Sequence, residues 1–133
     1  MKKILIVEDQ KEVREILEEF FRKEHGFNNI TFATNGLEGY AEAYLQKFDL
    51  ITSDYQMPFC NGGDMIFAIR KKAGINQHTP VIFVSAFIAD FMEKVSSLEA
   101  TYFVEKPIDF KRLSRYVKMA MLSQINKNFV NEV

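Results

Sequence analysis

Short apolar runs of strand length alternate with helix-like segments along the whole chain, and four of these runs end on a polar residue. The runs cover residues 4–7, 50–53, 81–84 and 102–105, and they lead into Glu8-Asp9, Asp54, Ser85 and Lys106-Pro107. Continuous apolar runs of this length are typical of strands that are buried on both faces of a parallel sheet. The carboxyl ends of such strands share one edge, where ligands bind. The polar residues are therefore expected to converge at that edge.

These side chains have the chemistry of a site for a cation and a phosphoryl group. Glu8, Asp9 and Asp54 supply three carboxylates, Ser85 a hydroxyl and Lys106 an ammonium group. Three carboxylates repel one another unless a cation lies between them. Mg²⁺ takes oxygen ligands and usually keeps waters and phosphate oxygens in its coordination shell. The sequence therefore predicts Mg²⁺ as the cofactor at this edge of the sheet.

The segments between the runs have helical periodicity and complete an alternating pattern. A weaker strand is predicted at residues 29–33, and helices are predicted before Gly26 and at about residues 35–46, 64–73, 89–98 and 110–125. Residues 55–63 contain Pro58 and two glycines, and we expect them to form a loop over the strand ends. Five such units joined by right-handed crossovers give an α/β fold, a three-layer α/β/α sandwich around a parallel sheet.

Two of these helices carry specific packing predictions. The second begins with Asn35 as its N-cap. Its apolar residues are predicted to pack into the core: Leu37, Ala41, Tyr44 and Leu45. The third helix is predicted to bury Met65, Ile66 and Ile69.

Length, composition and charge bound the class of protein. A chain of 133 residues with 47% hydrophobic and 26% charged residues is one globular domain of common size. A net charge of −1 gives no overall attraction to nucleic acid or membrane. No apolar stretch approaches the ~20 residues that cross a bilayer. The lone Cys60 excludes an internal disulfide and the N-terminus lacks a signal-peptide core, so we expect a cytoplasmic protein.

The order and spacing of these landmarks resemble the receiver domain of two-component response regulators, typified by the chemotaxis response regulator. The matching residues are Glu8-Asp9, the strand-ending Asp54 with Met57-Pro58, Gly62, Ser85-Ala86 and Lys106-Pro107. The resemblance implies a flavodoxin-like sheet of order 2-1-3-4-5. It assigns residues 1–125 to the receiver domain, and residues 126–133 are expected to form a frayed tail.

The resemblance also implies a role for each site residue. Asp9, Asp54 and the backbone carbonyl of Gln56 ligate Mg²⁺, and Glu8 acts largely through bound water. Asp54 is the nucleophile that accepts a phosphoryl group from a phosphohistidine. Ser85 then hydrogen-bonds a phosphate oxygen. Lys106 pairs with Asp54 and then with its phosphate, and the Lys106-Pro107 bond is cis.

Taken singly, each of these residues has an ordinary structural interpretation. Glu8 and Asp9 can be solvated carboxylates that open a helix, because acidic residues favour helix N-termini. Asp54 and Ser85 can be turn or cap residues, and Lys106 can be a solvated strand-end lysine. The combination in one chain is what favours the phosphoacceptor site.

The resemblance implies a switch at the edge of this site. Phosphorylation draws Ser85 inward, and an aromatic residue three positions before the lysine, here Phe103, rotates into the space. Phe103 lacks the hydroxyl of the tyrosine common at this position, so it is either a switch residue or a permanent core residue. Tyr102, Phe87 and Phe91 either form a partner surface with the fourth helix, fifth strand and fifth helix, or lie in the core.

Gln56 and Phe87 follow Asp54 and Ser85 by two residues, and these positions border the phosphoryl group in the family. We predict that they govern the access of hydrolytic water, and that the bulky Phe87 slows the loss of phosphate.

Three functions are compatible with this pattern. The first is a phosphoacceptor switch that catalyses its own phosphorylation and slow dephosphorylation without being a conventional enzyme. Its partners are a histidine kinase or histidine phosphotransfer protein and a downstream protein, with a phosphorylation-dependent homodimer left open and neither nucleic acid nor membrane expected. The second is a phosphohydrolase of the haloacid dehalogenase type, whose Asp-x-Asp signature is missing because Gln56 stands at the second aspartate. The third is a non-phosphorylated interaction module, which the presence of Asp9, Asp54, Ser85 and Lys106 argues against.

Overall fold

A computed structural model of the chain describes residues 2–71 and 73–132, with side chains as far as residue 124. The strands are β1 (Lys3–Val7), β2 (Asn29–Ala33), β3 (Leu50–Ser53), β4 (Val81–Ser85) and β5 (Thr101–Glu105). The helices are α1 (Lys11–His25), α2 (Gly36–Leu45), α3 (Gly62–Lys71), α4 (Met92–Val95) and α5 (Phe110–Glu132), and a 3₁₀ turn, η1 (Ile88–Asp90), precedes α4. Strands and helices therefore alternate as the apolar pattern predicts.

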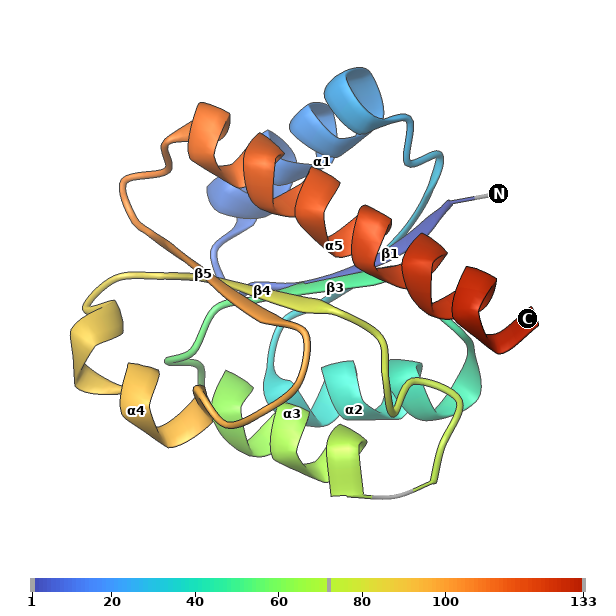
Figure 1. Ribbon diagram of the computed structural model, residues 1–133. Coiled ribbons are helices and arrows are strands. Elements are labelled where there is room, and N and C mark those ends of the chain that lie inside the picture. Colours follow the sequence, from blue (N-terminus) through green and yellow to red (C-terminus); the bar gives the residue numbers. More distant parts are fainter. Residues whose placement is uncertain (1, 72, 133) are drawn as a thin grey trace.

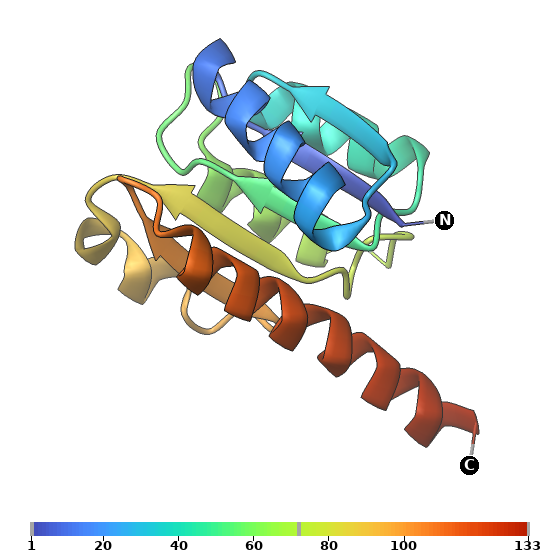
Figure 2. The same ribbon diagram turned by 90° about the horizontal axis from the view of Figure 1, so that it is seen from above.

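The five strands form one sheet in the order β2-β1-β3-β4-β5, and every neighbouring pair is parallel. Helices α1 and α5 cover one face of this sheet, and α2, α3 and α4 cover the other (Figure 1). Seen from above, α1 and α5 lie across the sheet, and α5 extends past its edge (Figure 2). The predicted three-layer sandwich and the strand order 2-1-3-4-5 are confirmed.

Alternate residues of the central strands build two cores, one on each face of the sheet. In β1, Leu5 and Val7 belong to the core under α2, α3 and α4, whereas Ile4 and Ile6 belong to the core under α1 and α5. All four side chains are fully or almost fully buried. Burying a Leu, Ile or Val side chain stabilises the fold by about 1.5–3 kcal/mol. This two-sided burial explains why the strand reads as a continuous apolar run.

Helix α2 packs on its neighbours in a different way from the one we predicted. Asn35 caps it by accepting a hydrogen bond from the Glu38 backbone amide at 2.9 Å. The buried residues of the helix are small: Gly36, Gly39 and Ala43. The predicted core residues Leu37, Tyr44 and Leu45 are 60%, 71% and 73% exposed, and Ala41 is exposed as well. A Cβ at Gly39 would collide with the sulfur of Met65, so the close approach of α2 and α3 depends on the absence of a side chain at this position.

Three other element boundaries differ from the predictions. Helix α3 begins at Gly62, which shortens the expected loop, although Met65, Ile66 and Ile69 are buried as predicted. The fourth helix, expected at residues 89–98, is a single turn after η1. Helix α5 runs to Glu132, so the end predicted near residue 125 is wrong and the segment 126–132 of the expected tail is helical. No glycine or proline follows Pro107 to end the helix earlier.

No helix among the described residues combines the length and the apolar character that crossing a membrane would require.

Candidate functional site

The carboxyl ends of β1, β3, β4 and β5 bring the predicted polar residues together. The backbone extends the sheet by a few bonds at this edge: the amide of Glu8 donates to the carbonyl of Ala33 at 2.9 Å, and that of Asp54 donates to Val7 at 3.0 Å. At the other side, the amide of Lys106 donates to the carbonyl of Ser85 at 2.9 Å. The Lys106–Pro107 peptide bond is cis, as the resemblance implies. The backbone hydrogen bonds between the strands therefore fix the Cα positions of these residues.

The ammonium group of Lys106 joins two carboxylates. Its Nζ donates to Oε1 of Glu8 at 2.7 Å and to Oδ2 of Asp54 at 3.0 Å. The other carboxylate oxygen of Asp54, Oδ1, accepts from the hydroxyl of Ser85 at 2.5 Å and from the backbone amide of Tyr55 at 2.7 Å. Both oxygens of Asp54 are thus held by hydrogen-bond donors, which fixes the orientation of the carboxylate.

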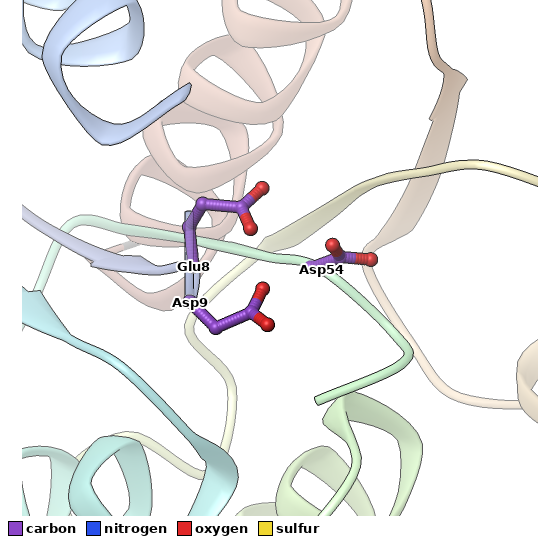
Figure 3. Close-up of side chains that lie close together, drawn as sticks. All are labelled: Glu8, Asp9 and Asp54. Atoms are coloured by element: carbon purple, nitrogen blue, oxygen red, sulfur yellow. The ribbon is translucent and has the colours of Figure 1, made fainter. Parts of the chain in front are cut away.

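Glu8, Asp9 and Asp54 form an acidic cluster beside this network. Each offers a carboxylate oxygen that lies within 4.8 Å of those of the other two. Figure 3 shows the carboxyl groups of Glu8 and Asp9 extending toward Asp54 from the end of β1. Glu8 is 1% and Asp54 9% exposed, whereas Asp9 is open to solvent. Three carboxylate oxygens lie close together, and the exposed Asp9 gives solvent access to them. This arrangement fits a small divalent cation that keeps waters in its coordination shell.

The electrostatics of the cluster favour an additional positive charge. Burial raises the pKa of Glu8 to about 7, with the negative charge of Asp54 acting in the same direction and Lys106 opposing it. Burial also disfavours the charged form of Lys106, but its hydrogen bonds to Glu8 and Asp54 outweigh this and raise its pKa. One ammonium group therefore does not fully compensate the acids around it, which is the situation that a divalent cation relieves.

A glycine at the start of α3 determines how closely this helix approaches the aspartate. A Cβ at Gly62 would collide with the carbonyl oxygen of Asp54 and would lie 2.8 Å from Oγ of Ser53. The amide of Gly62 donates to the carbonyl of Tyr55 at 2.7 Å, and Oγ of Ser53 donates to that of Asp54 at 2.7 Å. These two hydrogen bonds therefore hold the backbone carbonyls of Asp54 and Tyr55 in place.

The residues predicted to border the site have different environments. Ser85 is buried, and its hydroxyl faces Asp54. Gln56 is exposed in the loop after β3. The role of its backbone carbonyl as a Mg²⁺ ligand stays a prediction. Phe87 is 67% exposed and has a left-handed backbone with φ of 55°, a conformation that bulky residues rarely adopt.

The aromatic residues of the expected partner surface divide between core and surface. Phe91 is 3% exposed and belongs to the core. Phe103 is partly buried and stacks on Phe83, with ring centroids 5.9 Å apart. Tyr102 packs against Tyr116, with ring centroids 5.8 Å apart. Beside them a hollow of about 350 Å³ opens between α4, β5 and α5, lined by Ile88, Met92, Tyr102, Phe103, Arg112 and Tyr116.

The sequence patterns missed the part that Tyr55 plays. Its backbone amide donates to Asp54, and its ring lies parallel to that of Phe91 with centroids 3.9 Å apart. The available signal was an aromatic residue directly after the strand-ending aspartate. Its ring partner lies 36 positions further along the chain, so local periodicity does not reveal the contact.

Fold and site together define a flavodoxin-like α/β domain with an acidic, lysine-bridged site at the carboxyl edge of its sheet. The family model for the response regulator receiver domain matches residues 4–118. The chain belongs to this family, whose members act in two-component signalling.

Individual relatives agree with this assignment. The chain is 31% identical over 133 residues to the response regulator ArlR of Staphylococcus saprophyticus, covering 98% of this chain and 57% of that protein. Among solved structures, the N-terminal domain of an uncharacterized protein from Wolinella succinogenes is 30% identical, with a TM-score of 0.82 over 96% of this chain and 99% of that one. The receiver domain of a sensor histidine kinase from Pseudomonas aeruginosa PAO1, which holds magnesium in its active-site cleft, shares the fold at 21% identity, with a TM-score of 0.79 over 90% and 97% of the two chains.

Proposed function

We propose that Asp54 accepts a phosphoryl group from a phosphohistidine of a histidine kinase or histidine phosphotransfer protein, with Mg²⁺ as the cofactor. The observation that carries this proposal is the setting of Asp54. Its carboxylate is held by Ser85 and Lys106 and lies next to the carboxylates of Glu8 and Asp9. We assign the phosphoacceptor unit to residues 1–125.

The chemistry follows from the charges at the site. A carboxylate oxygen of Asp54 attacks phosphorus, the bond from phosphorus to the imidazole nitrogen breaks, and the electron pair leaves with the histidine of the donor. Asp9, Asp54 and the Gln56 carbonyl would hold Mg²⁺, with Glu8 acting through water, and the bound ion would supply positive charge next to the transferring group. Lys106 and Ser85 then exchange their contacts with the carboxylate for contacts with the new phosphate oxygens.

The switched surface is proposed to be the face formed by α4, β5 and α5. Its hollow combines apolar side chains with Arg112 and Glu105, a mixture that suits a protein partner. Ser85 ends β4, and the hollow begins at Ile88 three residues later. A downstream protein or a second copy of the phosphorylated chain is the proposed occupant.

Incubation with phosphoramidate or acetyl phosphate and Mg²⁺, followed by intact mass spectrometry, tests the phosphoacceptor function. We expect one phosphoryl adduct that is absent in Asp54→Asn and in EDTA. Asp90→Asn is the matched control, because Asp90 is exposed in η1 and its loss is expected to leave the adduct unchanged. Absence of any adduct would contradict the proposal in favour of an interaction module, and rapid turnover of phosphate esters would favour a hydrolase.

Phe87 is expected to slow the hydrolysis of the phosphorylated protein. Replacing it with alanine removes an aromatic ring from the position two residues after Ser85, so water reaches the acyl phosphate more easily. We expect Phe87→Ala to shorten the lifetime of the adduct severalfold, measured by intact mass after removal of the donor. Phe59→Ala is the matched control, since Phe59 is also highly exposed with positive φ. An unchanged or longer lifetime in Phe87→Ala counts against this role.

A further inference from the structure

We infer that the stacked rings of Tyr55 and Phe91 transmit the phosphorylation of Asp54 to the face formed by α4, β5 and α5. This inference rests on the proposed function and adds the residues through which the change travels. It makes Tyr55 and Phe91 positioning residues, because neither ring touches the reacting atoms.

The first step joins the site to the ring of Tyr55. The backbone amide of Tyr55 donates to Oδ1 of Asp54 at 2.7 Å and lies 3.4 Å from Oγ of Ser85. That oxygen of Asp54 also accepts the Ser85 hydroxyl. When Ser85 turns toward a phosphate, the donors around Oδ1 rearrange, and the amide of Tyr55 is one of them. The backbone of Tyr55 therefore responds to the state of the carboxylate.

The ring of Tyr55 is partly buried and approaches two other segments of the chain. A Cβ at Gly63 would lie only 2.5 Å from its Cε2 atom, so the start of α3 lies close to the ring. The ring of Phe91 lies 3.9 Å away, centroid to centroid, at an interplanar angle of 13°. Closely packed side chains leave few voids between them and therefore transmit displacement. A shift of the Tyr55 ring is thus passed to Phe91.

Phe91 connects this stack to the proposed output face. It lies at the junction of η1 and α4. The centroid of its ring is 5.9 Å from that of Phe83 and 6.4 Å from that of Phe103. Phe103 in turn lines the hollow between α4, β5 and α5. The contacts therefore run without a break from Asp54 through Tyr55, Phe91 and Phe103 to that hollow.

The segment that carries Phe91 combines a strained backbone with little regular structure. It begins at Phe87, whose backbone has a φ of 55°, and it contains only a 3₁₀ turn and one turn of α-helix. Its buried attachments to the body are Ile88, Phe91 and Val95. Strained residues in loops at functional sites often mark segments that switch. Phe103 has no hydroxyl, so its coupling to the site is apolar and runs through the stacked rings of Tyr55 and Phe91.

A single fluorescent reporter on the output face tests the coupling. The chain contains no tryptophan, so Tyr116→Trp places the only indole in the hollow. We expect its fluorescence to change when phosphoramidate and Mg²⁺ phosphorylate the protein. In the Phe91→Leu background the adduct still forms, and most of the fluorescence change is lost. Intact mass measured on the same samples separates the two readouts.

Further variants separate coupling from general destabilisation. Tyr55→Leu breaks the same stack from the other side and is expected to lose the fluorescence change, whereas Tyr55→Phe keeps the ring and restores it. Phe21→Leu is the matched control, because Phe21 is fully buried in the core under α1 and α5. A full fluorescence change in phosphorylated Phe91→Leu, or none in Tyr116→Trp alone despite an adduct, would overturn the inference. Absence of the adduct would instead refute the proposed function and, with it, the coupling.

Discussion

Replacing Lys106 with methionine is expected to lower the free energy of unfolding of the metal-free protein by about 3 kcal/mol, because it removes one partner from a buried ionic network. The Lys106 side chain is 19% exposed and bridges Glu8 and Asp54, whose side chains are 2% and 11% exposed. Methionine fills a similar volume without the charge, so the two carboxylates lose their shared counter-ion. Urea unfolding in EDTA measures this loss.

Mg²⁺ is expected to recover much of the stability of Lys106→Met, since a divalent cation at the acidic cluster replaces the missing positive charge. The increase in unfolding free energy on adding Mg²⁺ should therefore be larger in the variant than in the unchanged protein. Phosphorylation by phosphoramidate should be slower by about 100-fold, the usual effect of removing one group that stabilises a developing charge.

Lys47→Met is the matched control for this prediction. The Lys47 ammonium donates to the hydroxyl of Thr79 at 2.8 Å, and Lys47 lies before the amino end of β3, the opposite end from the acidic cluster. We expect its substitution to leave both the Mg²⁺ effect and the phosphorylation rate unchanged. If Mg²⁺ stabilised Lys106→Met no more than it stabilises the unchanged protein, the electrostatic account of the site would be wrong.

The sequence was sufficient to predict the sheet and the residues that meet at its edge, for a physical reason. Strands buried on both faces must be apolar along their length, so β1 and β4 are visible as uninterrupted runs. A parallel sheet places all its carboxyl ends together, so the residues directly after the runs were bound to converge. Asp54, Ser85 and Lys106 are consequently found where the pattern indicated.

Helix α2 shows why helix faces were harder to predict than strands. Its apolar residues Leu37, Tyr44 and Leu45 are exposed, and its buried side is made of glycine and alanine. Hydrophobic periodicity weights large side chains, whereas a helix that approaches its neighbours closely buries the smallest ones. The decisive contact is between Gly39 and Met65, which are far apart in sequence, so a local pattern does not contain it.

The same limit applies to the coupling between Tyr55 and Phe91. Taken singly, Phe91 had a core or a surface interpretation, and Tyr55 was predicted only to begin the loop after the strand. Only the approach of the loop after β3 to the segment after β4 makes them a stacked pair. Resemblance to a family predicts the reacting residues, but contacts of this kind depend on the aromatic residues of the individual chain.

Gly62→Ala is expected to destabilise the protein by about 3 kcal/mol, the upper part of the range for overpacking a tight site. In an exposed helix the same substitution would stabilise by about 1 kcal/mol, because alanine is the better helix former. Here the added Cβ collides with the carbonyl oxygen of Asp54 and approaches Oγ of Ser53, so α3 or the end of β3 must move. The sign of the stability change therefore reports the close approach of helix and strand, and urea unfolding measures it.

The same collision is expected to impair phosphorylation in Gly62→Ala, because it displaces the backbone that positions the Asp54 carboxylate. A misplacement of about 1 Å costs on the order of 100-fold in rate, which intact mass spectrometry after timed exposure to phosphoramidate would detect. Gly26→Ala is the matched control: its Cβ meets no atom within 4 Å, but its φ of 66° is left-handed. It is expected to cost about 1 kcal/mol through backbone strain and to leave the phosphorylation rate unchanged. Equal rates in Gly62→Ala and Gly26→Ala would show that the position of Asp54 does not depend on the start of α3.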